Sequence, residues 1–340
     1  MHLVWIAALM AGCSHRCLRP PVDPVPPEIS TPDPEPPPEA DRAAGWTATA
    51  LPVFDASTTA PGSLWSAAPL PGHQLLLAVR GFGAVRVDPT APARLAAFGD
   101  PELQLVTAAP DGALGLAAGF QRASAYDLLS GSERWQITYD DNPRAAAWSA
   151  DGADVYLAVG RSLERHDAAT GALRWRWTNR PSTDDGDPDS VSAVALTPDG
   201  ITVITHDRSR VVALLAANGA EVHTLLDLGA YVGALALSPD GEKLVIGGWD
   251  KQFHLIDRKS KRELAVHLTA GWAQAAAWSP DGTRYATLDL RGALTIHTAD
   301  GAPIAALEIP SDAESGLLWH PDGTLHAWAE GRLFAVRPPA

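Results

Sequence analysis

One turn motif recurs along the chain and restricts the fold more than any other feature. A representative copy, residues 273–292, reads AQAAAWSPDGTRYATLDLRG: an apolar run, a Pro-Asp-Gly turn and a second apolar run. Asp can accept a hydrogen bond from the backbone two residues on, and Gly tolerates a positive φ, so the motif favours a hairpin. Equivalent turns are centred on Pro71, Asp111, Asp151, Asp199, Asp240, Asp281 and Asp322. Four short apolar runs in each repeat of about 41 residues predict one four-stranded propeller blade per copy.

Seven copies predict an all-β fold, a seven-bladed β-propeller over residues 46–340. The last copy has only three apolar runs, SGLLWH, LHAWAE and RLFAVRP, so its fourth strand must come from elsewhere. The segment GWTATALPVF, residues 45–54, precedes the first complete blade and has no partner of its own. We expect this N-terminal strand to complete the last blade and close the ring, because an open ring would leave edge strands unpaired.

Several blades carry residues that resemble known repeat families. In blade five, LVIGGWDKQFHLID is similar to a WD-repeat blade, with Asp250 in the turn between its second and third strands. Blades two and three resemble quinoprotein-type blades (the YVTN-like group), in which Asp-x-x-Thr/Ser-Gly precedes a Trp that docks on the next blade. The matching positions are Asp127, Ser130, Gly131 and Trp135, and Asp167, Thr170, Gly171 and Trp175. The resemblance covers about residues 46–337 and implies the WD-repeat and quinoprotein-like propeller superfamily.

The first 45 residues have a different composition. The apolar run from Leu3 to Ala11 has the length of a signal-peptide core, too short to cross a bilayer. It ends in Met-Ala-Gly-Cys, which resembles the lipobox of bacterial lipoproteins. The resemblance implies a signal peptide over residues 1–12 and a lipid-modified Cys13; a plain secretory signal and a misplaced start codon are the alternatives. Residues 13–45, rich in Pro and acids, should form an extended tether. We therefore expect a lipoprotein of the bacterial outer membrane, facing the periplasm or the cell surface.

The residues give no indication of catalytic chemistry. A net charge of −14 disfavours nucleic acid as a partner. The sequence has no Gly-x-Ser-x-Gly elbow, phosphate-binding loop or His-Glu-x-x-His motif. Histidines at or near expected strands, His206, His254, His297 and His326, come from different blades and lack paired metal-ligand spacing, so we interpret them as solvated or locally hydrogen-bonded. We expect neither an enzyme nor a resident cofactor.

Charged loops indicate where a partner could bind. With the strands of a blade lettered A to D in chain order, the B–C turns and the D–A connections share one face. Each B–C turn carries a cation: Arg80, Arg122, Arg161, Arg208, Lys251, Arg291 and Arg332. Most D–A connections carry acids, including Asp100, Asp140 with Asp141, Asp227 and Asp312. The pattern is consistent with local pairing within each blade or with a charged face that selects a partner.

The one long insertion, residues 179–190, lies on the same face. Its Asp185, Asp187 and Asp189 alternate like the start of a calcium loop, but the Gly and the closing Glu of such a loop are missing, so we favour a solvated acidic loop. A long insertion in a repeat array usually marks the binding side. The candidate binding face comprises Asp140, Asp141, Asp185, Asp187, Asp189, Arg208, Trp249, Asp250 and Trp272.

These observations lead to a functional expectation. We expect a membrane-anchored, non-enzymatic propeller that acts as a protein–protein interaction or assembly scaffold in the cell envelope, with a protein or peptide as partner. A lactonase-like propeller hydrolase with a metal in the central channel is one alternative. A carbohydrate or small-ligand binder, with Trp249 and Trp272 as exposed stacking platforms, is another.

Overall fold

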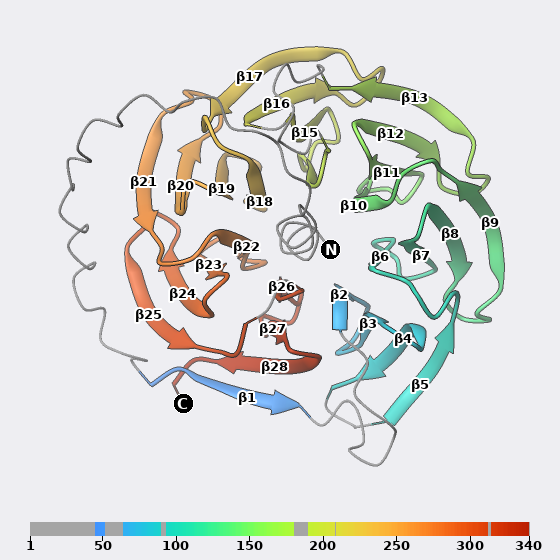
Figure 1. Ribbon diagram of the computed structural model, residues 1–340, viewed down its shortest axis with the longest axis horizontal. Helices are drawn as coiled ribbons and strands as arrows, with labels where there is room; N and C mark the ends of the chain where they lie inside the picture. Colours follow the sequence, from blue (N-terminus) through green and yellow to red (C-terminus); the bar gives the residue numbers. More distant parts are fainter. Residues whose placement is uncertain are drawn as a thin grey trace, which may run out of the picture.

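The computed structural model describes residues 45–51, 64–89, 93–179, 190–207, 209–311 and 314–339. These residues form seven four-stranded antiparallel sheets arranged as blades around a central axis (Figure 1). The expected all-β, seven-bladed propeller is therefore confirmed. Among the described residues, no helix is long and apolar enough to cross a membrane.

Each blade runs from its innermost strand A to its outermost strand D. Blade one holds β2 (Leu64–Pro69), β3 (Leu75–Val79), β4 (Gly83–Asp88) and β5 (Ala93–Phe98), and blade two holds β6 (Leu105–Ala108), β7 (Leu114–Gly119), β8 (Arg122–Asp127) and β9 (Glu133–Thr138). Blade three holds β10 (Pro143–Trp148), β11 (Asp154–Val159), β12 (Ser162–Asp167) and β13 (Leu173–Thr178), and blade four holds β14 (Val194–Leu196), β15 (Thr202–Asp207), β16 (Arg210–Leu215) and β17 (Glu221–Asp227). Blade five holds β18 (Val232–Leu237), β19 (Lys243–Gly248), β20 (Gln252–Asp257) and β21 (Glu263–Leu268), and blade six holds β22 (Ala273–Trp278), β23 (Arg284–Asp289), β24 (Ala293–Thr298) and β25 (Pro303–Glu308). Blade seven holds β26 (Gly316–Trp319), β27 (Leu325–Ala329), β28 (Arg332–Arg337) and, as its outermost strand, β1 (Thr47–Leu51).

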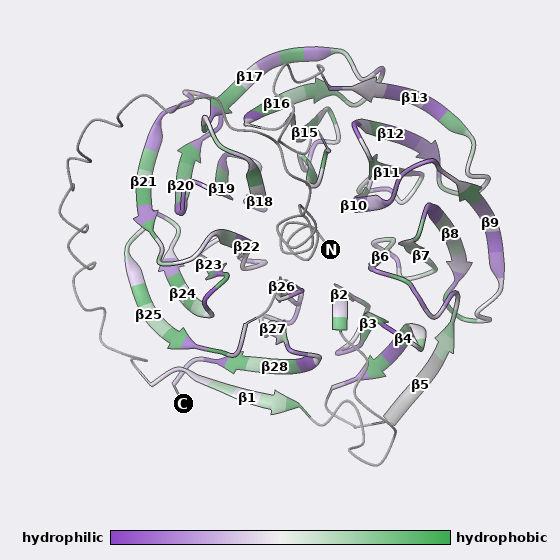
Figure 2. Ribbon diagram, in the orientation of Figure 1, coloured by the Kyte–Doolittle hydropathy of each residue, from purple (hydrophilic) through white to green (hydrophobic). Residues whose placement is uncertain are grey.

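The middle strands are the most deeply buried because blades pack against both of their faces. Every residue of β11 is buried, whereas every residue of β13 is exposed or only partly buried. The outer strands β9 and β13 accordingly carry hydrophilic stretches along the rim (Figure 2). Seven apolar clusters hold the ring together, and each contains residues from two neighbouring blades.

The A–B turns use the expected Asp-Gly chemistry. In blade six, the Asp281 carboxylate accepts a hydrogen bond from the backbone N–H of Thr283 over 3.0 Å, and Gly282 has a φ of 68°. The Ser279 hydroxyl also donates to Asp281, over 2.6 Å. These hydrogen bonds lower the pKa of Asp281 to about 2, with the Ser279 hydroxyl as the largest cause. The corresponding Asp in blades two to five and seven accepts the same backbone hydrogen bond.

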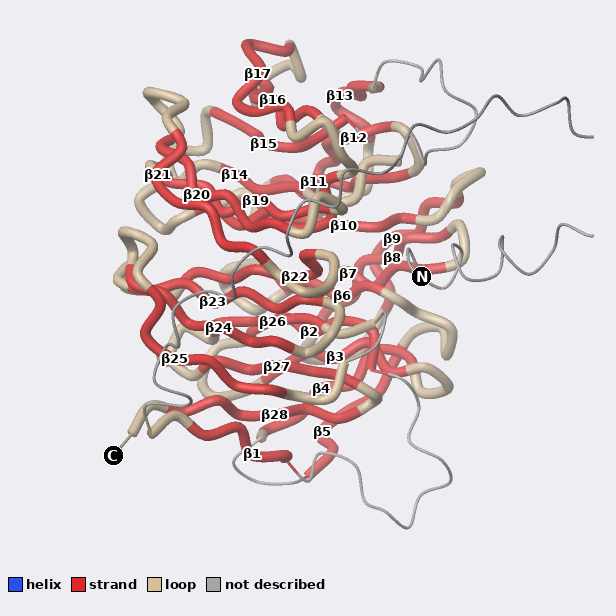
Figure 3. The backbone as a smooth tube through the Cα atoms, turned by 60° about the vertical axis from the view of Figure 1, so that its left-hand side comes forward, coloured by secondary structure: helices blue, strands red, loops and turns tan. Residues whose placement is uncertain are grey.

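The N-terminal strand closes the ring, as predicted. Strand β1 pairs antiparallel with β28, from Thr47 opposite Arg337 to Leu51 opposite Leu333. The two strands lie side by side at one edge of the molecule (Figure 3). Trp46, just before β1, is 6% exposed and joins the apolar cluster between blades six and seven. Residues 52–54 of the predicted closing segment lie outside the described residues.

Candidate interaction face

The D–A connections and the B–C turns lie at the same end of each blade, and this end is called the loop face below. Asp140 and Asp141 are exposed on it, between β9 and β10. Trp249 and Asp250 lie in the B–C turn of blade five, and Trp272 lies in the connection that enters blade six. Cys13, Asp185, Asp187, Asp189 and Arg208 lie outside the described residues, so lipidation and calcium binding stay predictions.

Three aromatic side chains form a continuous row on the loop face, and we call it the aromatic row. The ring centroid of Trp249 lies 5.1 Å from that of Tyr231 and 5.2 Å from that of Trp272. The two indole planes differ by only 19°, so they are stacked. Both indoles are partly buried. The interpretation of Trp249 as an exposed stacking platform is therefore wrong, because its ring lies between two other aromatic rings.

A buried polar relay holds one end of the aromatic row. The Tyr231 hydroxyl donates to Ser192 Oγ over 2.9 Å, and Ser192 Oγ lies 2.9 Å from His206 Nε2. The backbone N–H of Ser192 also donates to His206 Nε2, over 3.0 Å. Burial lowers the pKa of His206 to about 4, so its ring is neutral near pH 7 and Nε2 acts as the acceptor.

Two further carboxylates fix the loops that carry the indoles. Asp289 is fully buried, and its carboxylate accepts hydrogen bonds from the backbone N–H groups of Gly271, Arg291 and Ala293, each over 2.9 Å. In the turn that follows Trp249, Asp250 Oδ2 lies 2.8 Å from His254 Nε2, and His254 Nδ1 lies 2.7 Å from Glu263. Asp250, followed by Glu263, raises the pKa of His254.

Some of the loop charges pair locally, as one of the two interpretations requires. Arg122 Nη1 lies 3.4 Å from Asp100 Oδ2, and Arg80 Nε lies 3.6 Å from Glu102 Oε2. No such ion pair involves the exposed Asp140 or Asp141 among the described residues. The exposed cations Lys251 and Arg291 likewise have no carboxylate partner in the described parts of the chain. Local pairing therefore accounts for only part of the charge pattern.

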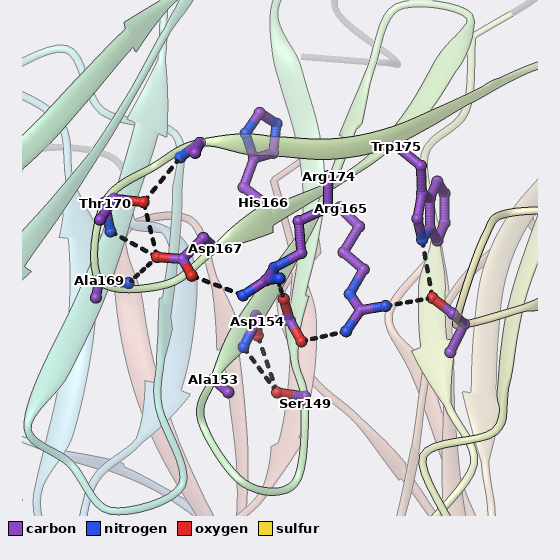
Figure 4. Close-up of polar contacts among 12 residues, drawn as sticks. Ser149, Ala153, Asp154, Arg165, His166, Asp167, Ala169, Thr170, Arg174 and Trp175 are labelled. Atoms are coloured by element: carbon purple, nitrogen blue, oxygen red, sulfur yellow. Dashed lines mark hydrogen bonds and ion pairs between the residues drawn. The ribbon is translucent and has the colours of Figure 1, made fainter.

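The opposite face carries the quinoprotein-like motif, which is best seen in blade three (Figure 4). Asp167 Oδ1 accepts hydrogen bonds from the backbone N–H groups of Ala169 and Thr170 and from the Thr170 hydroxyl. Asp167 Oδ2 accepts from Arg174 over 2.7 Å. The Thr170 hydroxyl, followed by its backbone N–H, lowers the pKa of Asp167. The motif therefore shapes the C–D turn.

The same motif positions a tryptophan that joins successive blades. The Trp175 indole N–H and the Arg165 guanidinium both donate to the Ala216 carbonyl in blade four, over 2.8 and 2.7 Å (Figure 4). In blade two, the Trp135 indole N–H donates to the Ala168 carbonyl in blade three over 2.8 Å. Trp135 and Trp175 therefore dock on the next blade, as the resemblance to quinoprotein-type blades implies.

Of the two interpretations of the strand histidines, local hydrogen bonding is the one that His206, His254 and His297 follow, through Ser192, Asp250 with Glu263, and Thr287. His206, His297 and His326 are almost fully buried. Burial is the largest cause of their lowered pKa values, which lie at about 4, 3 and 4. Of these four histidines, only His254 is partly buried and ion-paired. Sequence reasoning missed the Ser192–His206–Tyr231 relay, because its three residues share no motif.

Comparisons with known proteins agree with this architecture. The family model described as outer membrane protein assembly factor BamB matches residues 62–225, which correspond to blades one to four. A segment of 117 residues, 33% of the chain, is 38% identical to actin-interacting protein 1-2 of Arabidopsis thaliana. The chain spans only 18% of the length of that relative. Seven four-stranded blades, Trp-mediated docking between blades and the match over residues 62–225 show that the chain is a seven-bladed β-propeller similar to the quinoprotein-like family.

Proposed function

We propose that this propeller is a non-enzymatic scaffold that binds a protein partner in the bacterial cell envelope. The match of residues 62–225 to the BamB family model carries the proposal, since the description of that family names it an outer membrane protein assembly factor. A closed ring with seven inter-blade clusters presents its loops on a rigid support, which lowers the entropic cost of binding.

The proposal includes a lipid anchor at Cys13 and a tether over residues 13–45. The lipobox-like sequence and the Pro-rich composition support both. Replacing Cys13 with Ser in the full chain should shift the protein from the membrane fraction to the soluble fraction. Quantitative blotting of the two fractions tests the anchor, and an unchanged distribution would contradict it.

The partner surface includes the acidic half of the loop face. Asp140 and Asp141 are exposed without an ion-pair partner among the described residues, and the acidic insertion enters the next blade. We expect a variant with Asp140, Asp141, Asp185, Asp187 and Asp189 changed to Asn to lose a specific envelope partner that the parent chain captures. A matched control is Glu242→Gln, because Glu242 is an exposed acid in the A–B hairpin of blade five, at the opposite end.

Mass spectrometry of the captured proteins gives the readout. Capture by the parent and by the control, but not by the five-residue variant, supports the scaffold and its acidic face. Equal capture by all three forms places the partner surface elsewhere, and the absence of any specific protein contradicts the scaffold.

The non-enzymatic part of the proposal has its own test. Ser192 Oγ lies within hydrogen-bond reach of His206 Nε2, as a nucleophile and its base would. The same nitrogen also accepts the Ser192 backbone N–H, so its lone pair already has a structural partner. We therefore expect no labelling by a fluorophosphonate serine-hydrolase probe. Labelling that disappears in Ser192→Ala would overturn the non-enzymatic assignment.

A further inference from the structure

The aromatic row has polar groups that the rest of the fold does not use. Four tryptophans elsewhere donate their indole N–H to backbone carbonyls: Trp135 to Ala168, Trp175 to Ala216, Trp278 to Ala236 and Trp319 to Gly323. In three others, Trp65, Trp148 and Trp328, the indole nitrogen is buried without a partner. Trp249 and Trp272 have no such acceptor among the described residues, and their indole nitrogens are not among the buried unsatisfied atoms. Two indole N–H donors therefore remain available at the partly buried surface of the row.

Two cations lie next to these donors. Lys251 follows Trp249 by two residues in the same turn, and its carbonyl accepts the backbone N–H of Thr269, just before Trp272. Arg291 lies against the other side of that connection, where a side-chain carbon added to Gly271 would come within 3.2 Å of Arg291 Cγ. Both cations are exposed and lack a carboxylate partner among the described residues. The aromatic row is thus bordered by hydrogen-bond donors and positive charge.

The row is also held in place before any ligand arrives. The Tyr231–Ser192–His206 relay fixes one end, and the Asp289 carboxylate fixes the connection that carries Trp272. The Asp250–His254 contact fixes the turn that carries Trp249. Because these anchors reduce the side-chain and loop entropy that binding would otherwise cost, the row is pre-organised.

The loop face is electrostatically asymmetric. Over blades two and three it displays Asp140 and Asp141 without a paired cation, among the described residues. Over blades five and six it displays Lys251 and Arg291 without a paired acid in the described parts of the chain, and the exposed Asp227 lies further back, where β17 of blade four ends. A carboxylate-bearing ligand would be repelled by the first region and attracted to the second, which fixes its position and direction on the face.

From these observations, we propose that the aromatic row with Lys251 and Arg291 is a docking site for an extended acidic segment of a partner protein that also carries an aromatic side chain. The aromatic side chain packs on the row, since tryptophan and tyrosine are preferred anchors at interfaces. The carboxylates and carbonyls of the segment accept hydrogen bonds from the indole N–H groups, Lys251 and Arg291. This assignment rests on the proposed scaffold function and specifies the partner for the blade five and six region.

Three fluorescein-labelled peptides of about twelve residues provide the probe for the full chain in mild detergent. The first repeats Asp-Phe-Glu-Gly, the second Lys-Phe-Arg-Gly and the third Asp-Ala-Glu-Gly. Fluorescence anisotropy should show that the first peptide binds at least about tenfold more tightly than the other two. Equal binding of the two acidic peptides would reduce the site to a charge effect, and a preference for the basic peptide would reverse the assigned polarity; either result overturns the proposal.

Charge-reversal variants locate the site without disturbing the core. The double variant Lys251→Glu and Arg291→Glu should lose about tenfold in affinity for the first peptide. Arg332→Glu is the matched control, because Arg332 is an exposed cation at the corresponding turn of blade seven, and it should bind as the parent does. An equal loss in the control would place the peptide elsewhere and overturn the site.

Trp272→Phe adds a test of the indole itself. Phe keeps an aromatic ring but removes the N–H donor, so affinity for the first peptide should fall by about threefold to tenfold at an unchanged melting temperature. Unchanged affinity would remove the indole from the site. If the parent chain captures an envelope partner, as described under the proposed function, but binds none of these peptides, only the docking site is contradicted. If the chain neither captures a partner nor binds a peptide, the scaffold function is contradicted as well.

Discussion

The indole ring of Trp135, in blade two, covers Gly171, in the C–D turn of blade three. A side-chain carbon on Gly171 would lie 2.9 Å from Cδ2 of Trp135. One blade further on, Trp175 covers Gly219 in the same way, with an added carbon 2.7 Å from Cε3. The glycine that forms the C–D turn of one blade therefore also receives the tryptophan of the preceding blade.

Gly171→Ala should destabilise the ring through both effects. The φ of 72° costs an alanine about 1–2 kcal/mol, and the clash with Trp135 adds about 1–3 kcal/mol. Gly200→Ala is the matched control, since Gly200 has a φ of 67° but no atom within 4 Å of an added carbon. Urea unfolding should show the larger loss of unfolding free energy for Gly171→Ala. Equal losses would mean that the tryptophan contact contributes nothing.

Trp135→Phe isolates the hydrogen bond of the same contact. The variant leaves the Ala168 carbonyl without its indole donor. This loss should lower the free energy of unfolding by about 1–3 kcal/mol, in addition to the effect of the smaller ring. Trp148→Phe is the comparison, because Trp148 is equally buried at 9% exposed and its indole nitrogen has no hydrogen-bond partner. Chemical denaturation of both variants gives the difference, and a similar cost for the two would argue against a contribution from the inter-blade hydrogen bond.

The fold was predictable from the sequence because its determinants are local. Each Asp-Gly turn is formed by atoms within a few residues, as in the Asp281 turn, and each flanking apolar run is a strand buried between blades. Even the non-local closing strand followed from counting, since blade seven lacked its fourth run and residues 45–54 lacked a partner. The docking role of Trp135 and Trp175 followed from the repeated motif that precedes them.

The candidate site was less predictable because it depends on contacts between blades. Tyr231, Trp249 and Trp272 come from three different loops, and no spacing in the sequence indicates that their rings meet. His206 occupies the fifth position of its strand, where β7, β11 and β23 have Ala118, Ala158 and Leu288. A polar residue at a repeated core position is a usable signal, and it would have indicated a buried partner such as Ser192.

Removal of the closing strand should weaken the whole ring. A chain that begins at residue 52 lacks β1 and Trp46, which leaves β28 as an unpaired edge and opens the cluster between blades six and seven. Loss of a buried tryptophan alone predicts a fall in melting temperature of about 5–15 °C. A chain that begins at residue 45 retains all seven complete sheets and serves as the control. Calorimetry measures both, and equal melting temperatures would mean that closure adds no stability.

Stability should fall between pH 6.5 and pH 4. Burial lowers the pKa values of His206, His297 and His326 to about 4, 3 and 4. In this window the unfolded chain binds protons at these sites and the folded chain does not, so unfolding becomes more favourable as the pH falls. At pH 5 each of these histidines should lower the free energy of unfolding by about 1–2 kcal/mol relative to pH 7. His254 acts in the opposite direction, because its raised pKa stabilises the folded state below pH 6.5.

His326→Leu separates the contribution of one buried histidine. His326 Nδ1 is buried without a hydrogen-bond partner, so an apolar side chain removes a proton-binding site without breaking a contact of that nitrogen. The unfolding free energy of the variant, measured in urea from pH 4.5 to pH 8, should change less with pH than that of the parent. The two curves should converge above pH 7 and separate by about 1–2 kcal/mol at pH 5. Parallel curves would show that His326 takes up no proton on unfolding in this range, and the acid sensitivity would then have to come from His206 and His297.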